Sequence, residues 1–431
     1  MNYSILRINA IGGLQLGFDA FYQTNKLAQL SYDTAIRQMQ EAGYIIPGSW
    51  ASEMRSLGNE AHDLVIDSQL LQSHWLKEFK PCEEEKGIYD VLALQLQHYK
   101  PEIVLIYAGA FWFLSKEIRS SFFKQFPFIR HLIGLWGDDL PAGRQFEDFA
   151  DLSLVFAADY PFYQSFKKAQ IPCEVILNCF DHKLIEQPSF DSPRLHDFLF
   201  AGNSGYGFED HRDRFYDLDF LIQKTSLKVY CNEPPFLPQP PLFKKFAKEL
   251  ICRSKRSWVL KTLQSFGLSN TKNKTLQLFH HFDLRFEKCF LGKWNWHEGV
   301  LPLSKKYPDR CLPPVFGVDY YKLLSNAKIV YNRHLDNTRY SGNIRMFEAT
   351  GLGACLLTDR PRLSSQYFEL DSEIVCYDTS EECAEKAKYL LEHPAKRKEI
   401  ARRGQERTLR DHTVKTRCET MHAGIRHYLL K

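Results

Sequence analysis

A polar segment between two apolar runs carries side chains that can hold a phosphorylated ligand. The segment spans residues 332–343 and is followed by Arg345 and Glu348. Arginines can neutralise a diphosphate, and a helix that begins near residue 344 would add backbone N–H groups and the positive end of its dipole. A carboxylate beside a diphosphate is unfavourable unless it binds another part of the ligand, and the usual partner is a ribose diol. The spacing therefore predicts a phosphate site at Arg333, Asn343 and Arg345, with Glu348 placed to bind a ribose.

Short apolar runs on both sides of this segment predict the elements that would position it. Residues 327–331 and 354–358 are expected to form buried strands. Between them, residues 344–350 predict a short helix that Gly351 and Gly353 close. A strand–loop–helix–strand unit of this kind builds parallel sheets.

The sequence GNIRMFEATGLGACLLTD, residues 342–359, resembles the C-terminal donor-site segment of GT-B glycosyltransferases, and most closely the spore-maturation-protein-like (CgeB-like) family. The similarity covers roughly the last quarter of the chain, including Phe368 and residues 316–321, 373–377, 390–394, 400–405 and 411–413. In that family a glutamate on this helix holds the ribose of a nucleotide-sugar, and the matching residue is Glu348. Many retaining GT-B enzymes have a second glutamate eight positions earlier, where this chain has Tyr340. The resemblance therefore supports the nucleotide site better than a particular stereochemistry.

The resemblance implies an α/β chain with the GT-B fold. Two Rossmann-like, doubly wound domains would face a central cleft, and the C-terminal helix would cross back to the N-terminal domain. The alternation of apolar and helical patterns in the N-terminal half agrees, with helical periodicity over residues 21–43 and strands predicted at 4–10, 63–66, 103–106, 130–135, 152–157 and 173–177. We expect an N-terminal acceptor domain at residues 1–187, a nucleotide-sugar domain at 188–410 and the returning helix at 411–431.

Ligands of doubly wound sheets bind at the carboxyl ends of strands, which singles out two places in the N-terminal half. Gly12 and Gly13 could let the backbone approach an acceptor, although two glycines after a strand are also typical of an ordinary turn. Asp138 and Asp139 could bind the acceptor or act as general base, or they could be solvated loop acids. A metal-binding role is discounted, because the resemblance implies a reaction that needs no divalent metal and no cofactor beyond the nucleotide-sugar.

Two further candidate groups follow strands of the C-terminal half. Gly202 and Asn203 would let the backbone approach a diphosphate, and Arg212 would pair with its charge, although an ordinary strand-to-helix turn explains the same pattern. Asn332 and His334 would face the sugar or phosphate, His334 as a catalytic residue, or His334 could be a core or surface histidine. The resemblance favours ligand contact for these residues.

A segment over about residues 234–301 breaks the alternation of strands and helices and is expected to be an insertion. Within it, residues 243–266 predict a helix with many lysines and arginines among aromatic and aliphatic residues. Such a helix could lie on an anionic membrane surface or hold an anionic acceptor, or it could be a solvated face of a packed helix. Trp294 and Trp296 could stack on a sugar or lie in the core.

The composition fits a cytoplasmic protein. The 431 residues are 44% hydrophobic and 14% aromatic, and the net charge of +4 is too mild to indicate nucleic acid. The 11 cysteines lack a CxxC pair, which argues against a zinc site or a disulfide framework. The N-terminus lacks a signal-peptide pattern, and the most apolar run, residues 103–114, is too short to cross a bilayer. The predicted basic helix suggests an alternative localisation, peripheral at the inner face of the membrane.

The first hypothesis is a glycosyltransferase that moves a sugar from a nucleoside-diphosphate-sugar, such as a UDP-sugar, to a hydroxyl group. The acceptor would be a glycan, a lipid-linked molecule or a protein, in glycan, surface-polysaccharide or protein glycosylation. The alternatives are a non-catalytic nucleotide- or glycan-binding protein on the same scaffold, and a protein that binds polyanions or membrane surfaces through the basic helix. The sequence leaves open the sugar, the base, the acceptor, the stereochemistry, the catalytic base and the oligomeric state.

Overall fold

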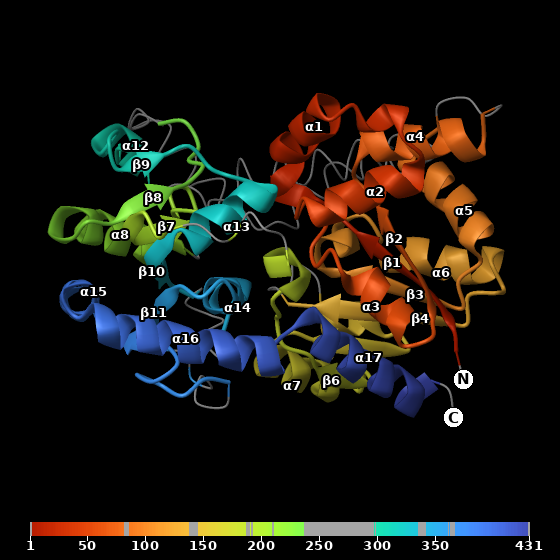
Figure 1. Cartoon of the computed structure of the whole chain (residues 1–431). Coiled ribbons are helices and arrows are strands. Elements are labelled where there is room, and N and C mark those ends of the chain that lie inside the picture. The colour runs from red at the N-terminus through yellow and green to blue at the C-terminus, as the bar shows by residue number, and fades with distance from the viewer. Residues whose placement is uncertain are drawn as a thin grey trace, which may run out of the picture. The chain divides into compact units, whose positions relative to one another are not determined.

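The chain consists of two parallel β-sheets with helices packed on them, as the computed structural model in Figure 1 shows. The structure describes residues 2–81, 86–137, 145–186, 190, 193–208, 211–236, 297, 299–334, 342–360, 362 and 367–429. Several residues singled out from the sequence lie outside these ranges: Asp138, Asp139, Trp294, Trp296, Tyr340 and the predicted basic helix at 243–266.

The first sheet has six parallel strands in the order β2-β1-β3-β4-β5-β6. Its strands are β1 (Ser4–Asn9), β2 (Glu60–Val65), β3 (Ile103–Tyr107), β4 (His131–Trp136), β5 (Leu154–Ala157) and β6 (Cys173–Val175). The helices are α1 (Gln15–Thr24), α2 (Tyr32–Glu41), α3 (Trp50–Ser56), α4 (Gln69–Phe79), α5 (Ile88–Tyr99), α6 (Lys116–Gln125) and α7 (Tyr160–Lys168). The predicted doubly wound sheet of the N-terminal half is therefore confirmed.

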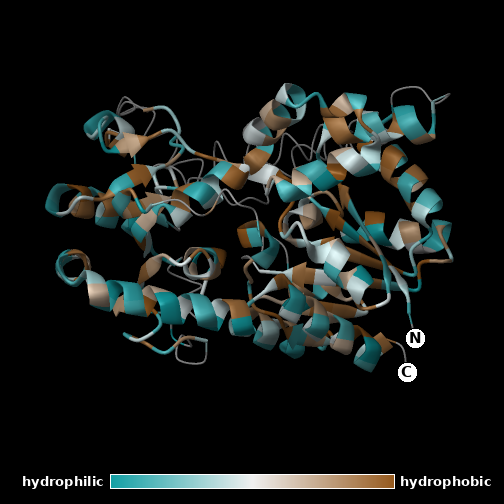
Figure 2. Ribbon diagram, viewed as in Figure 1, coloured by the Kyte–Doolittle hydropathy of each residue, from teal (hydrophilic) through white to brown (hydrophobic). Residues whose placement is uncertain are grey.

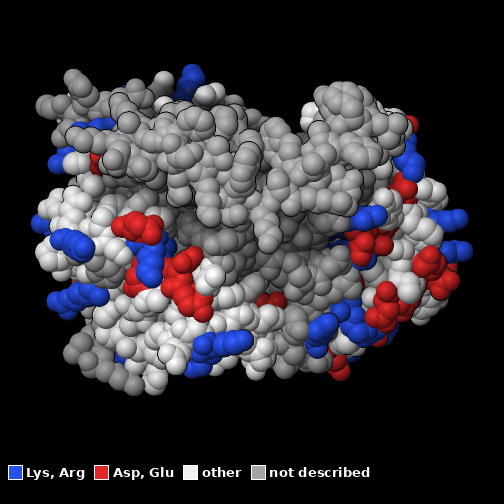
Figure 3. All heavy atoms as spheres, turned by 180° about the vertical axis from the view of Figure 1, so that it is seen from behind, with Lys and Arg blue, Asp and Glu red and all other residues white. Residues whose placement is uncertain are grey.

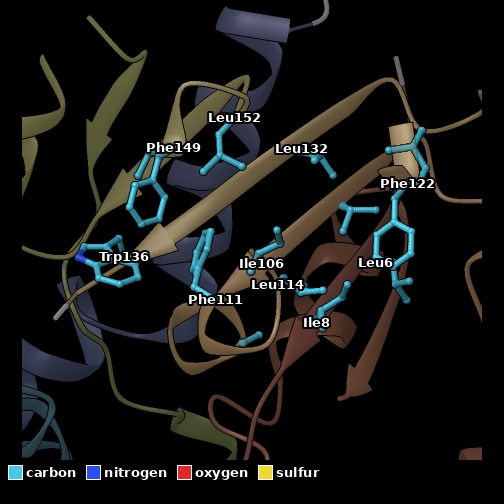
Figure 4. Close-up of a cluster of buried hydrophobic side chains, with 14 of the residues drawn as sticks. Leu6, Ile8, Ile106, Phe111, Leu114, Phe122, Leu132, Trp136, Phe149 and Leu152 are labelled. Atoms are coloured by element: carbon cyan, nitrogen blue, oxygen red, sulfur yellow. The ribbon is translucent and has the colours of Figure 1, made fainter. Parts of the chain in front are cut away.

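Aromatic rings pack over the carboxyl ends of the central strands of this sheet (Figure 4). Phe111 lies after β3, Trp136 ends β4, and Phe149 precedes β5. Their ring centroids are 5.4 Å apart for Phe111 and Trp136, 5.2 Å for Phe111 and Phe149, and 5.1 Å for Trp136 and Phe149, all at steep angles that suit edge-to-face contact. This packing fixes the backbone from which the loops after β3 and β4 begin.

The prediction of a single helix over residues 21–43 is wrong. The chain forms α1 and α2, with Lys26 in the left-handed region between them at a φ of 53°. Ser31 then starts α2, because its side chain accepts a hydrogen bond from the backbone N–H of Thr34 at 3.3 Å. The apolar periodicity of the sequence continues through this break, so periodicity alone predicted one helix. The capping residue Ser31 was the signal for a second helix.

The second sheet also has six strands, in the order β12-β11-β10-β7-β8-β9. They are β7 (His196–Ala201), β8 (Lys228–Tyr230), β9 (Cys311–Leu312), β10 (Ala327–Asn332), β11 (Cys355–Asp359) and β12 (Val375–Tyr377). Its helices are α8 (Arg212–Lys224), α12 (Leu303–Lys306), α13 (Gly317–Ser325), α14 (Ile344–Gly351), α15 (Ser380–Glu392) and α16 (Pro394–Asp411). The predicted strand–loop–helix–strand unit is β10, α14 and β11, and its two strands pair in parallel.

The last helix, α17 (Val414–Leu429), returns to the first sheet. Its residues Val414, Cys418 and Met421 pack in one buried cluster with Trp50 of α3 and with strands β1, β3, β4 and β5. At the crossover, Phe180 N–H donates to the carbonyl of His412 at 2.9 Å, and Val414 N–H donates to the carbonyl of Phe180 at 3.0 Å. The expected return of the C-terminal helix is therefore present.

Contacts between Cα atoms divide the chain into two compact units, one of residues 1–200 and 315–431 and one of residues 201–314. The domain limits predicted at residues 187/188 and 410/411 stay predictions. Hydrophobic residues concentrate in the strands, and hydrophilic residues cover the outer face of helices such as α16 (Figure 2). None of the helices in the described part of the chain combines the length and apolar composition of a membrane span.

Candidate functional site

The amide of Asn332 joins three elements at the carboxyl end of the second sheet. Asn332 ends β10 and is fully buried. Its Nδ2 donates to Oγ1 of Thr358 in β11 at 3.0 Å, and its Oδ1 accepts from Nδ2 of Asn343 at 3.0 Å and from Nη1 of Arg345 at 3.3 Å. Both ends of the amide are thus bonded, as a buried polar group requires. In this arrangement Asn332 supports the start of α14, and a direct ligand contact of its own stays a prediction.

The first turn of α14 is arranged to receive an anion. Asn343 precedes the helix, but its side chain caps no backbone N–H and instead bonds Asn332 and the carbonyl of Arg333, the latter at 3.4 Å. The guanidinium carbon of Arg345 lies 4.9 Å from the ring centroid of Phe200, and its Nε is buried without a hydrogen-bond partner among the described residues. Uncapped N–H groups and a cation with spare donors are the features that bind phosphates at helix N-termini. Arg333, half-buried beside Asn332, adds a second cation to this region.

Glu348 lies one turn further along α14 and is only 5% exposed. Its Oε2 accepts a hydrogen bond from the hydroxyl of Tyr320 in α13 at 2.7 Å. Burial raises the pKa of the Glu348 carboxyl, while hydrogen bonds from Tyr320 and Tyr321 and the nearby charge of Arg345 lower it. The carboxylate is therefore held by partners on two helices.

A small cavity borders this carboxylate within the unit of residues 1–200 and 315–431. Its lining includes Glu348, Tyr321 and Ile344 together with Asp181 and residues 45–48. Asp181 is itself fixed, because its carboxylate accepts from the backbone N–H of Ser49 at 2.8 Å and from the Ser49 hydroxyl at 2.6 Å. Glu348 and Asp181 are the two carboxylates among the lining residues.

His334 is buried at the end of β10, with an exposed fraction of 2%. Its backbone N–H and its Nδ1 both bond Oδ1 of Asp359, the last residue of β11, at 2.9 and 2.6 Å. Its Nε2 lies 3.2 Å from the sulfur of Met346. Both ring nitrogens therefore face protein groups, and the ring anchors the loop that follows β10. The catalytic role proposed for His334 stays a prediction.

The glycine turn after β1 is held by a carboxylate. The backbone N–H groups of Ile11 and Gly12 donate to Asp67 at 2.8 and 3.0 Å, so that of Gly12 is already used. Gly12 has a φ of 55°, which explains why glycine stands there. A Cβ added to Gly12 or Gly13 would meet no atom within 4 Å, so the turn has open space beside it. The structure thus leaves Gly13 as the better candidate for a backbone contact with an acceptor.

Gly202, Asn203 and Arg212 belong to the unit of residues 201–314, where the two former follow β7 and Arg212 begins α8. Gly202 donates its N–H to the carbonyl of Tyr230 at 2.9 Å, and Asn203 Oδ1 accepts from the N–H of Gly205 at 2.8 Å. Asn203 thus shapes the turn through a local bond. Arg212 is the first residue of α8 and is exposed, with its guanidinium carbon 5.9 Å from the ring centroid of Tyr216.

The structure brings together Asn332, Asn343, Arg345 and Glu348, and it adds three residues that the sequence did not single out: Phe200, Tyr320 and Asp359. The position of Asp359 at the end of a parallel strand was a usable signal. The contacts of Phe200 and Tyr320 depend on how β7 and α13 pack, which no local pattern reports. The described residues contain no group of three or more histidines, cysteines or carboxylates that could hold a metal ion.

The chain is similar in sequence to one protein family and in structure to several solved proteins. Residues 277–423 match a protein-family model described as glycosyl transferase-like. This matched range includes β10, α14 and β11. No curated protein sequence shows significant similarity to the chain.

Several solved structures share the fold over nearly the whole chain. HepE from Anabaena, in complex with UDP and glucose, is 13% identical with a TM-score of 0.51, over 98% of this chain and 99% of that chain. Sucrose-phosphate synthase from Thermosynechococcus elongatus is 10% identical with a TM-score of 0.50, over 98% of both chains. A glycosyltransferase from Rickettsia africae is 12% identical with a TM-score of 0.50, over 99% of both chains. At these identities the similarity shows the fold, and it confirms the GT-B architecture expected from the sequence.

Proposed function

We propose that this chain is a glycosyltransferase that moves a sugar from a nucleoside-diphosphate-sugar to a hydroxyl group of an acceptor. The observation that carries the proposal is the placement of Arg345 and Glu348 one turn apart on α14. Arg345 lies at an uncapped helix N-terminus and Glu348 borders a cavity, and both lie in the segment that matches the glycosyl transferase-like family. A cation at a helix N-terminus and a carboxylate one turn away suit the two ends of a nucleoside diphosphate.

In this proposal the diphosphate binds the first turn of α14 and Arg345, and a ribose hydroxyl binds Glu348. Charge grows on the diphosphate as the bond to the sugar breaks, and donors fixed in advance stabilise it. Arg345, Arg333 and the backbone N–H groups at the start of α14 supply that stabilisation, so no divalent metal is needed. HepE, which shares the fold, is known in complex with UDP-glucose, which makes UDP-sugars the first donors to test.

The acceptor side is proposed from the first sheet. Gly13 follows β1 at its carboxyl edge, where ligands of such sheets bind. The acids Asp138 and Asp139 come soon after β4 in the sequence. In an inverting reaction one of these acids would act as base, and in a retaining reaction the leaving phosphate would help to deprotonate the acceptor. The acceptor is a glycan, a lipid-linked molecule or a protein, and the family we propose within the GT-B enzymes is the CgeB-like one.

A peripheral contact with an anionic membrane through the basic segment 243–266 belongs to the same proposal. On the face in Figure 3, basic and acidic side chains are interspersed over the described surface. On α16, Glu399 accepts hydrogen bonds from both Arg402 and Arg403. The basic segment is therefore the part of the chain to test for membrane contact, by neutralising Lys244 and Lys245 and measuring binding to anionic vesicles.

The enzyme assignment is tested by incubating the purified chain with a panel of nucleotide-sugars and measuring release of the nucleoside diphosphate. We expect slow release with one donor, lost in Glu348→Ala and retained in Glu392→Ala, which alters an exposed residue at the end of α15. Nucleotide binding without release from any donor, with or without added glycan acceptors, would favour the non-catalytic binding protein instead.

A further inference from the structure

Tyr320 and Glu348 come from different helices and meet in the part of α14 that we assign to the nucleotide. The hydroxyl of Tyr320 donates to Oε2 of Glu348 at 2.7 Å. Tyr320 lies in the first turn of α13, and α13 packs beside α14. The pair therefore has a geometry set by the packing of two helices.

The surroundings of Glu348 are mostly neutral. Tyr320 and Tyr321 face it from α13, and Arg345 faces it from its own helix. Cys179 and Asp181, on either side of Phe180, line the same cavity, and the Asp181 carboxylate accepts a hydrogen bond from the Ser49 hydroxyl. Arg345 is thus the one cation in this set, and the tyrosine hydroxyls are the neutral donors that help to keep the buried carboxyl ionised.

We propose that Tyr320 is a positioning residue of the ribose site, whose hydroxyl holds Oε2 of Glu348 so that the other carboxylate oxygen receives a ribose hydroxyl of the donor. The inference rests on the proposed function and adds a residue to it. An ionised carboxylate has two oxygens and about four lone-pair positions, so the bonds from Tyr320 and Tyr321 still leave room for the ligand. A protonated carboxyl would offer fewer acceptors, so the hydroxyl acts both on orientation and on charge.

Tyr320 could also have the opposite effect on nucleotide binding. Tyr320 could occupy the position of the ribose and compete with it, in which case removing the hydroxyl would tighten nucleotide binding. The two arrangements predict opposite changes in affinity and can be separated with one substitution.

The direction of the pH effect follows from the groups that face Glu348. Burial raises the pKa of its carboxyl, and the bond from Tyr320 lowers it. Without the Tyr320 hydroxyl the pKa of the Glu348 carboxyl rises further. The carboxyl is then protonated at a higher pH, and nucleotide binding is lost at a higher pH as the pH falls. A hydrogen bond to a charged group is strong enough to move this midpoint by about one pH unit.

The test is a calorimetric titration of UDP-glucose, whose diphosphate does not titrate in this range, between about pH 5 and pH 8. The proteins are the full chain, Tyr320→Phe and the control Tyr389→Phe, an exposed tyrosine on α15 that is 50% exposed. We expect Tyr320→Phe to bind several-fold more weakly at about pH 8 and to lose binding at a midpoint about one pH unit higher, with the control unchanged. Tighter binding, or an unchanged midpoint, would overturn the inference.

A second measurement does not need the nucleotide. The carboxyl carbon of Glu348 can be titrated by NMR in protein labelled at glutamate, with Glu348→Gln assigning the signal. We expect its midpoint to move upward in Tyr320→Phe, and an identical midpoint would overturn the inference. If the wild-type chain binds no nucleotide-sugar, the proposed function fails while this titration still reports on Tyr320.

Discussion

The hydroxyl of Tyr320 donates to Oε2 of Glu348 at 2.7 Å, and this bond joins α13 to the helix that carries the proposed donor site. Arg345 lies in the first turn of the same helix, and its Nη1 donates to Oδ1 of Asn332, at the end of β10, at 3.3 Å. Glu348 and Arg345 are thus each fixed by a residue from a neighbouring element. Fixed side chains lose little conformational freedom when a ligand binds, which favours affinity.

Replacing Glu348 with glutamine should weaken nucleotide binding about 10- to 100-fold, because a hydrogen bond to a charged acceptor is replaced by one to a neutral amide. Calorimetry with UDP at neutral pH measures the change. Glu392→Gln, an exposed residue on α15, is the matched control and should bind as the wild type does. Equal affinity in Glu348→Gln would show that the carboxylate does not contact the nucleotide.

Arg345→Gln should weaken UDP far more than uridine, because the arginine is assigned to the diphosphate and not to the nucleoside. The measurement is the ratio of the two dissociation constants in the variant and in the wild type, and we expect it to change by about 10-fold or more. Arg426→Gln removes an exposed arginine of α17 and should leave the ratio unchanged. A parallel loss for UDP and uridine would point to a general effect on the fold.

Gly404→Ala should destabilise the protein by about 1–3 kcal/mol. A Cβ at this position of α16 would lie 2.4 Å from the backbone carbonyl oxygen of Glu373, which cannot move as a side-chain end could. This clash outweighs the gain of about 1 kcal/mol that alanine gives in a helix. Chemical denaturation measures the difference, and Gly13→Ala, where a Cβ meets no atom within 4 Å, is the control. Stability equal to that of the wild type would contradict the close contact.

The stability of the chain should fall between pH 7 and pH 5 through His412. Burial lowers the pKa of this histidine from 6.5 to about 4, so the unfolded state binds a proton that the folded state does not. The stabilisation is present above about pH 6.5 and is lost as the pH falls toward 4, by about 2 kcal/mol at pH 5.

Denaturation curves at the two pH values, in the wild type and in His412→Gln, measure this effect. The variant should lose that part of the pH dependence, since glutamine can still donate to the carbonyl of Tyr367, the partner of His412 Nε2 at 3.1 Å, but cannot be protonated. His393→Gln, at an exposed histidine, should keep it. The same slope in His412→Gln and the wild type would assign the effect to other groups.

The sequence was sufficient for the parts of the site that lie within one local unit. The apolar runs at β10 and β11 and the glycines after α14 predicted this strand–loop–helix–strand unit and placed Arg345 and Glu348 on its helix. These signals are local because strand and helix periodicity depend on neighbouring residues.

The partners of these residues could not be predicted in the same way. Tyr320 reaches Glu348 across 28 positions of sequence, and His334 reaches Asp359 across 25, so both contacts depend on tertiary packing. The break between α1 and α2 was missed because apolar periodicity runs through it, although Ser31 carried a capping signal. Periodicity reports which face of a helix is buried and does not report where the helix stops.

The most direct test of the account is a crystal structure of the full chain with UDP. We expect a ribose hydroxyl within about 2.6–3.2 Å of Glu348, and phosphate oxygens at the first turn of α14 that bond the guanidinium of Arg345. UDP bound elsewhere, with Glu348 still closed off by Tyr320 and Arg345 without a phosphate partner, would contradict it.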